Sequence, residues 1–215
     1  MGRRRLWGRL GRRRTPLLVG VLALVIALGI TGSYYGRAYW IKSHGITLTP
    51  RQAHASVLVP FYLQNDAEWR DQAMGDSSYR LSGSGCLVAC LAASLSAMGV
   101  DTDPGSLNQA FSRAGVYTAN AEVIWSEIQK AVPGISYRYT RVFGAGTLEE
   151  DLENGRLPLV KVGYLGGGAP HWVLVIGAED GEFLTMDPLD ATRTPAPLSR
   201  HGKVYAYRAL VPAER

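Results

Sequence analysis

An uncharged stretch near the start of the chain limits the possible folds most strongly. It runs over residues 15–36, with a strictly apolar core at residues 17–30. A helix of about 20 such residues spans the hydrocarbon core of a bilayer. The stretch reaches that length at Tyr34 and Tyr35, whose aromatic rings suit the membrane interface. The sequence therefore predicts a transmembrane anchor at residues 15–35 and a separate domain after it.

Positive charge is concentrated ahead of this anchor. Seven of the 23 Lys and Arg residues are arginines within the first fourteen positions, which leaves 16 basic against 18 acidic residues in the rest of the chain. The positive-inside rule then predicts that residues 1–14 are a basic cytoplasmic N-terminus and that the domain lies outside. The nearly neutral remainder has no basic stripe, so we expect no nucleic-acid partner.

Other interpretations of this N-terminal region stay open. Ala27-Leu28-Gly29 fits a small-x-small cleavage site, so the segment could be a signal peptide and the domain could be secreted. Arg12-Arg13-Arg14-Thr15 could be part of a twin-arginine export signal. Residues 36–56 have mixed polarity without a clear period, and we expect a linker there. Residues 57–212 have the size of one domain with a single core.

Cys86 occupies a position typical of a reactive thiol. It follows Ser82-Gly83-Ser84-Gly85 and precedes the apolar run 87–98, so it falls in the first turn of a predicted helix. The unpaired N–H groups and the positive dipole end at a helix N-terminus favour the thiolate. Cys90 lies one turn later on the same helix face, where geometry disfavours a disulfide with Cys86. We expect Cys90 to be a small buried apolar residue.

A predicted hairpin brings a histidine close to an aspartate. His171 begins one apolar strand, Asp187 directly follows the next, and Glu179-Asp180-Gly181 is a turn signal between them. Such a turn pairs residues whose numbers sum to about 360, which places Asp187 one diagonal step from His171. A carboxylate that near can orient a histidine as a general base. With Cys86, the pattern predicts a site for thiol chemistry.

Short motifs in a fixed order resemble a known family. They are Val59-Pro60-Phe61-Tyr62-Leu63-Gln64-Asn65-Asp66, Trp69, Gly75-Asp76-Ser77-Ser78-Tyr79, Ser84-Gly85-Cys86, His171-Trp172-Val173 and Asp187-Pro188. With these motifs, most of the chain after residue 57 resembles the bacteriocin-processing, double-glycine-leader peptidase-like family of papain-like cysteine peptidases. The resemblance implies a nucleophile, a general acid and base, an orienting acid and an oxyanion-hole donor, which are respectively Cys86, His171, Asp187 and Gln64.

The chain departs from the family pattern after the cysteine. Relatives often have a small or acidic residue and then Pro or Thr, where this chain has Leu87-Val88-Ala89-Cys90. This difference affects the expected substrate preference more than the expected chemistry. Asn65 or Gln72 could replace Gln64 as the oxyanion donor.

The remaining sequence predicts an α+β order of elements. We expect helices at residues 106–114, at 121–132 and from Thr147, and strands at 135–143, 157–165 and 203–210. Helices first and an antiparallel sheet afterwards is an α+β arrangement. With the resemblance, it predicts a papain-like cysteine peptidase fold, in which the nucleophile helix packs on an antiparallel sheet, preceded by one transmembrane helix.

The other histidines do not suggest a metal site. His44 and His54 fall in the expected linker and His201 in an expected surface loop, and no four suitable ligands cluster in the sequence. Gly166-Gly167-Gly168 lacks the spacing and the lysine of a phosphate-binding loop, so it is either a mobile rim beside His171 or a simple flexible loop. We expect no metal and no organic cofactor.

These observations together predict a membrane-anchored, extracytoplasmic cysteine peptidase-like enzyme. Its substrates would be peptides, proteins or cell-wall peptides, and its contact with the membrane would be the N-terminal helix. Two alternatives stay open. The same site could transfer the acyl group to an amine, as an acyltransferase or transpeptidase does, or the domain could be a non-catalytic module that binds peptides or cell wall.

Overall fold

The computed structural model describes residues 11–213, and of residues 11–17 it describes the helical backbone. The chain divides into two compact units, Met1–Trp40 and Ile41–Arg215. Four of the arginines on which the predicted orientation rests lie outside the described residues, at positions 3, 4, 5 and 9.

The first unit consists of most of one long helix, α1 (Gly11–His44). Its segment Leu18–His44 is long and apolar enough to cross a membrane, a test that a signal sequence also passes. Large apolar side chains are exposed along it, among them Leu18, Leu28 and Ile30. Lipid or another apolar partner is the environment that such a surface needs. The helix continues nine residues beyond Tyr35, where the expected anchor ends.

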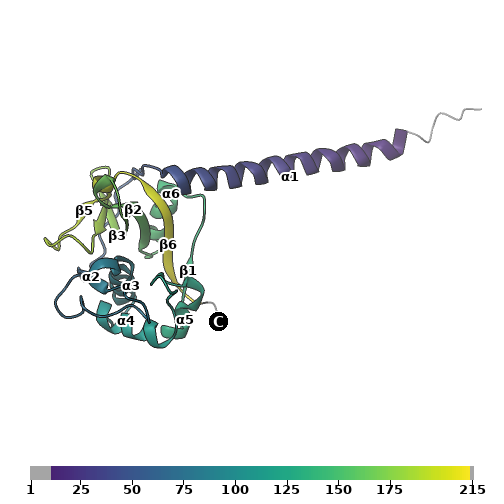
Figure 1. The fold of residues 1–215 in the computed structure, drawn as a ribbon. Helices are drawn as coiled ribbons and strands as arrows, with labels where there is room; N and C mark the ends of the chain where they lie inside the picture. Colours follow the sequence, from purple (N-terminus) through teal and green to yellow (C-terminus); the bar gives the residue numbers. More distant parts are fainter. Residues whose placement is uncertain (1–10, 214–215) are drawn as a thin grey trace, which may run out of the picture. The chain divides into compact units, whose positions relative to one another are not determined.

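The second unit is built on one antiparallel sheet of six strands in the order β1-β6-β2-β3-β4-β5 (Figure 1). The strands are β1 (Ile135–Arg138), β2 (Pro158–Gly163), β3 (Pro170–Glu179), β4 (Glu182–Met186), β5 (Ala196–Pro197) and β6 (Val204–Pro212). The predicted hairpin is the pair β3–β4. Its open end has the expected register, with Leu174 opposite Met186, so the residue numbers there sum to 360.

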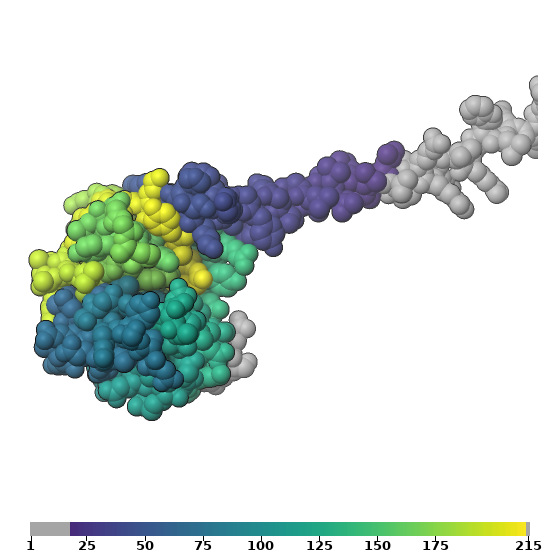
Figure 2. Space-filling model, in the orientation of Figure 1, coloured from purple at the N-terminus to yellow at the C-terminus, as the bar shows by residue number. Residues whose placement is uncertain are grey.

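Helices cover both faces of the sheet. They are α2 (Leu81–Ser84), α3 (Cys86–Ala97), α4 (Pro104–Arg113), η1 (Trp125–Glu127), α5 (Ile128–Ala131), α6 (Ala145–Glu153), η2 (Tyr164–Gly166) and η3 (Leu198–His201). Alternate residues of β3 enter two separate cores. Leu174 packs with α3 and α4, whereas Val173 packs with Leu148 of α6 on the opposite face. In Figure 2 the helical part, coloured blue to teal, lies directly against the sheet, coloured green to yellow.

The helix expected at residues 121–132 is wrong in its first part. Only η1 and the short α5 form there, and Ala121 has a left-handed backbone with φ of 59°. The segment before η1 bends back on itself, because Tyr117 bridges to Val123 and the Ile124 N–H donates to the Val116 carbonyl at 2.7 Å. These pairings across a turn replace the helical hydrogen bonds that local propensity favours.

The segment expected to be a linker also differs from the expectation after His44. Residues 45–56 lie against the sheet, where Ile46 bridges to Val204 and His54 to Ala178. Leu48 is buried, and the His54 side chain is 9% exposed rather than solvated. Mixed polarity in this segment reflects a chain that covers the sheet with some side chains and faces solvent with others.

Candidate active site

The thiol of Cys86 is placed by the glycine before it. Gly85 ends α2, where its N–H donates to the Leu81 carbonyl at 2.8 Å, and it also serves as the N-cap of α3. A Cβ added at Gly85 would lie 2.6 Å from the Leu81 oxygen, so this tight junction admits only glycine. The half-buried Cys86 is therefore the first residue of α3, as predicted, beside N–H groups that no capping side chain occupies.

The structure brings His171 and Asp187 together at the open end of the β3–β4 hairpin. The Nε2 atom of His171 lies 2.7 Å from Oδ1 of Asp187, and both side chains are buried. Cys86 lies near enough to His171 to raise the pKa of the imidazole. Since Nε2 is bonded to Asp187, Nδ1 is the ring nitrogen left for the thiol. The structure therefore joins His171 and Asp187 directly and places Cys86 in their neighbourhood.

The surroundings of His171 and Asp187 favour their charged forms. Burial by itself lowers the pKa of His171, but the hydrogen bonds and negative charges of Asp187 and Cys86 outweigh burial and raise the pKa to about 9. Burial raises the pKa of Asp187, but its hydrogen bonds to His171, His201 and the Leu189 N–H hold that pKa well below the usual range. Near neutral pH, the pair is an imidazolium beside a carboxylate.

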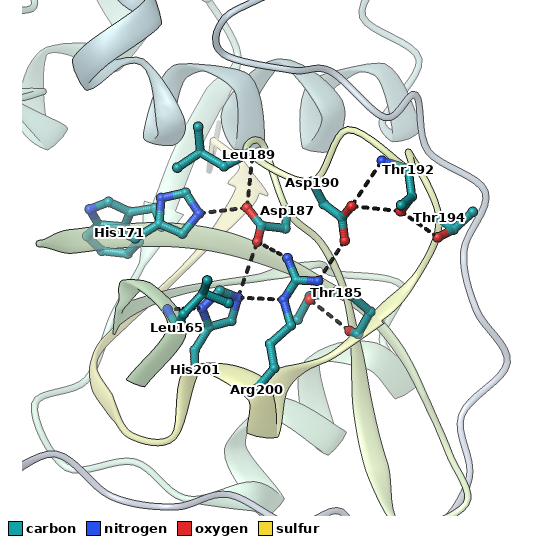
Figure 3. Close-up of polar contacts among 12 residues, drawn as sticks. Leu165, His171, Thr185, Asp187, Leu189, Asp190, Thr192, Thr194, Arg200 and His201 are labelled. Atoms are coloured by element: carbon teal, nitrogen blue, oxygen red, sulfur yellow. Dashed lines mark hydrogen bonds and ion pairs between the residues drawn. The ribbon is translucent and has the colours of Figure 1, made fainter. Parts of the chain in front are cut away.

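A second set of groups holds Asp187 from the side away from His171 (Figure 3). Arg200 donates from Nη2 to Oδ2 of Asp187 and from Nη1 to Asp190 at 2.6 Å. Asp187 is further fixed by the Leu189 N–H, which donates to Oδ1 at 2.9 Å. With donors on both oxygens, the carboxylate has little freedom to rotate away from His171.

His201 completes this set, and its position contradicts the expected surface loop. The side chain is buried, with Nε2 3.3 Å from Oδ2 of Asp187. Its Nδ1 accepts a hydrogen bond from the Leu165 N–H at 3.2 Å, so the proton of the neutral ring is on Nε2, the atom 3.3 Å from Asp187. Arg200 Nε also lies 3.3 Å from this Nε2. Two N–H groups cannot bond each other, so we assign the Nε2–H of His201 to its contact with the Asp187 carboxylate.

Sequence reasoning missed Arg200 and His201. They lie on η3, which reaches Asp187 because β5 returns antiparallel to β4, with Ala196 opposite Thr185. A two-residue strand followed by a short turn has no recognisable sequence period. The signal that could have found them is a buried carboxylate that needs more than one donor.

Gln64 connects the chain segments on either side of the site. Its backbone N–H donates to the Pro188 carbonyl at 3.0 Å, and its Nε2 donates to the Ser82 carbonyl at 2.7 Å. The side chain is buried, and its Oε1 has no hydrogen-bond partner among the residues that the structure describes. An amide NH₂ has two donors. Since Ser82 takes one, the second N–H of Gln64 is available for another acceptor.

Cys90 is buried one turn after Cys86, as expected. Its thiol donates to the Trp172 carbonyl at 3.4 Å, and burial, with added repulsion from Cys86 and Asp187, raises the pKa of Cys90 well above the ordinary value. A buried thiol with a raised pKa is a poor nucleophile. The two cysteines of the chain are both free in the structure and differ in exposure.

We therefore expect iodoacetamide to alkylate Cys86 selectively near neutral pH. Peptide mapping by mass spectrometry after a short exposure of the folded chain would locate the label. The Cys86→Ala variant serves as the control and should take up almost none at the same time point. Labelling of Cys90 in preference to Cys86 would contradict the assignment of Cys86 as the reactive thiol.

Comparison with known proteins supports the fold. A crystal structure from Bacillus anthracis, whose description as a C39-like peptidase is itself provisional, matches with a TM-score of 0.50 and 15% sequence identity. The match covers 76% of this chain and 100% of that one. No protein-family model matches the chain. No curated protein matches it either.

The fold class predicted from the sequence is confirmed. The chain has a papain-like α+β fold with an antiparallel six-stranded sheet, preceded by an N-terminal apolar helix. At 15% identity the likeness shows the fold alone. The function has to be argued from the site.

Proposed function

We propose that the chain is a membrane-anchored, extracytoplasmic cysteine peptidase-like enzyme that hydrolyses peptide or amide bonds. The observation that carries the proposal is the hydrogen-bonded pair His171 and Asp187 with Cys86 near it. One imidazole is 2.7 Å from a buried carboxylate, and a thiol at a helix N-terminus is close enough to raise the pKa of that imidazole. A nucleophile, a base and a group that orients the base are the parts that thiol catalysis needs.

In the proposed reaction, the Cys86 thiolate attacks the carbonyl carbon of the scissile bond. The carbonyl π electrons move to oxygen, and the resulting tetrahedral intermediate collapses when His171 gives its proton to the leaving amine. A thioester to Cys86 remains. His171, now neutral, takes a proton from water as that water attacks the thioester, and the carboxylic acid leaves while Cys86 returns to thiolate and His171 to imidazolium.

Gln64 and the Cys86 N–H are the proposed donors to the oxyanion. The second N–H of the Gln64 side chain is free for this role. Hydrogen bonds from its side chain to Ser82 and from its backbone to Pro188 hold the amide between the segment before Cys86 and the segment after Asp187. The alternatives receive less support. Gln72 accepts a hydrogen bond from Asn108 of α4 at 3.2 Å, and Asn65 is exposed.

An assay on full-length protein in detergent tests the proposed activity. The substrates are randomised peptides, cell-wall peptides and peptides with a double-glycine site, a class that the family resemblance suggests. Products are read by mass spectrometry, which also separates hydrolysis from transfer to an added amine. Cleavage by the wild type and none by Cys86→Ala is the expected result. A wild type that binds these peptides and never cleaves them would favour the binding module.

The proposed orientation gives a separate expected result. Because the positive charges precede the apolar segment of α1, protease added to intact cells should digest the domain that follows the helix. An immunoblot with antibody to the domain reads the loss, and a cytoplasmic protein that stays intact is the control. Protection until the membrane is broken would reverse the orientation. A mature protein that starts after about residue 29 and washes off would show signal-peptide cleavage instead.

A further inference from the structure

Four aromatic rings form a row that begins at Trp172, the residue after His171. Trp172 of β3 lies 6.0 Å from Trp125 of η1, Trp125 lies 5.4 Å from Tyr137 of β1, and Tyr137 stacks on Tyr139 at 6.0 Å, all between ring centroids. Arg208 of β6 extends over this row, with Cζ 5.5 Å from the Trp125 centroid and 4.7 Å from the Tyr139 centroid. These contacts hold the guanidinium by cation–π attraction.

The row and Arg208 share one sheet face with Lys161. Trp172 is directly opposite Lys161 on β2, and Arg208 is directly opposite Leu159, two residues along β2. Residues two apart on a strand point to the same face. That face is the one packed against α3, because Leu159 belongs to the same core as Leu91. Lys161 and Arg208 are therefore diagonal neighbours beyond the edge of that core.

These two cations have no carboxylate partner among the described residues, unlike the other half-buried basic residues of the domain. Arg138, Arg156 and Arg200 each form an ion pair, whereas neither Arg208 nor Lys161 has a carboxylate oxygen within 4.0 Å among residues 11–213. Arg208 donates from Nη1 to the Tyr207 carbonyl at 2.7 Å, and its buried Nε has no partner within the described part of the chain. A desolvated guanidinium with an unused donor can gain a charged hydrogen bond from an incoming anion.

Other charges nearby do not supply that anion. Glu127, the acidic residue of η1, is paired with Lys130. Burial lowers the pKa of Arg208, and the positive charge of Arg141 lowers it further. The half-buried rings of Trp125 and Trp172, with the exposed Tyr139, offer apolar surface around the cations. The arrangement combines unsatisfied positive charge with surface that packs on a peptide.

Trp172 connects the row to the proposed catalytic residues. It directly follows His171, and its carbonyl contacts Cys90 one turn after Cys86. The Trp172 ring and the His171 imidazole extend from opposite faces of β3, because successive residues of a strand alternate. The Trp172 ring is on the face that α3 covers, and Cys86 is the first residue of α3. The row and the proposed nucleophile are therefore on the same side of the sheet.

We propose that Arg208 and Lys161, with the aromatic row, form a substrate subsite that binds a carboxylate of the peptide attacked by Cys86. The inference rests on the proposed peptidase function and specifies its substrate class. Arg208 binds the carboxylate through its planar fork, Lys161 adds a point charge, and the rings pack on the neighbouring peptide groups. The carboxylate is either an acidic side chain or the C-terminus of the peptide.

Libraries of randomised decapeptides test the subsite on full-length protein in detergent. One library has a fixed Glu, a second has Gln in its place, and each is made with a free or an amidated C-terminus. Sequencing the products locates the carboxylate relative to the cleaved bond. We expect wild type to prefer a carboxylate at one position by roughly tenfold, from the usual strength of a charged hydrogen bond. The two C-terminal forms distinguish a side chain from a chain end.

Matched variants assign the preference to this surface. Arg208→Met and Lys161→Met should each remove most of it, and Arg208→Lys should keep part of it because charge remains without the fork. Arg113→Gln removes one positive charge from an exposed position on α4 and should leave the preference and the cleavage rate unchanged. If Arg208→Met unfolds, as circular dichroism would show, the half-buried Lys161 still provides the test.

The outcomes separate this inference from the proposed function. Cleavage by wild type with equal use of Glu and Gln would overturn the subsite and leave the peptidase function standing. With no cleavage at all, the function fails, and the same libraries are then bound to Cys86→Ala protein and the retained peptides sequenced. Retention without a preference for carboxylate would overturn the subsite in that case as well.

Discussion

Replacing Cys86 or His171 with alanine should abolish turnover of any substrate that the wild-type chain cleaves. In the proposed mechanism each change removes a group that takes part directly in bond making or proton transfer, so we expect a loss of at least about a thousandfold in kcat/KM. The double variant should be little worse than either single variant, because groups that act as one unit are strongly non-additive. Steady-state rates of the four proteins, wild type included, measure this.

Cys90→Ala is the matched control for this experiment, because it removes the other thiol from the same helix. Cys90 is buried and has a raised pKa, so its loss should leave the reaction intact if the protein stays folded. Circular dichroism verifies the fold of each variant. Full activity of a folded Cys86→Ala protein would eliminate the thiol mechanism, and losses that simply add in the double variant would argue against a shared apparatus.

Replacing Asp187 with asparagine should lower activity and shift its pH dependence. The change keeps the side-chain volume but removes the charge that stabilises the imidazolium, and a loss of roughly ten- to ten-thousand-fold is reasonable for an orienting acid. In wild type, His171 has a pKa of about 9, so its protonated form and the upper limb of the rate profile extend to about pH 9. Without Asp187, burial lowers that pKa, and the upper limb should move to lower pH.

The same shift affects stability. The folded-state pKa of His171 lies above its ordinary value of 6.5. Protonation therefore stabilises the fold fully below pH of about 6.5, and the contribution is lost as pH rises through about 9. Denaturant unfolding of wild type and Asp187→Asn across this range measures the effect, and kcat/KM profiles measure the catalytic one. An unmoved upper limb in Asp187→Asn would show that Asp187 does not set the charge state of His171.

The parts of the site that depend on short-range geometry could be predicted from the sequence. The turn at residues 179–181 fixes the register of β3 and β4, so the approach of Asp187 to His171 follows from counting residues. A β-bulge between Val175 and Gly177 interrupts this pairing, but the residue numbers at the open end still sum to 360. The start of α3 follows from a glycine before an apolar run. Local chain geometry is sufficient in both cases.

Features that depend on packing between distant segments could not be predicted. His201 reaches Asp187 only after β5 has paired with β4, and the Leu165 N–H then determines which ring nitrogen carries the proton. Residues 45–56 cover the sheet through single bridges that have no sequence period. The helix expected at 121–132 was favoured by local propensity, yet the pairing of Tyr117 with Val123 across a turn prevails in its first part.

The junction at Gly85 separates two tasks that are often attributed to one residue. The Leu81 oxygen leaves no room for a side chain at 85, so the backbone there sets where position 86 lies, whatever side chain position 86 carries. The reactive atom is therefore exchangeable in principle, whereas its location is not. A lineage that lost the thiol would keep the Gly85 junction and the start of α3 in place, with the histidine and carboxylate still near position 86. It could acquire a different nucleophile by a single codon change.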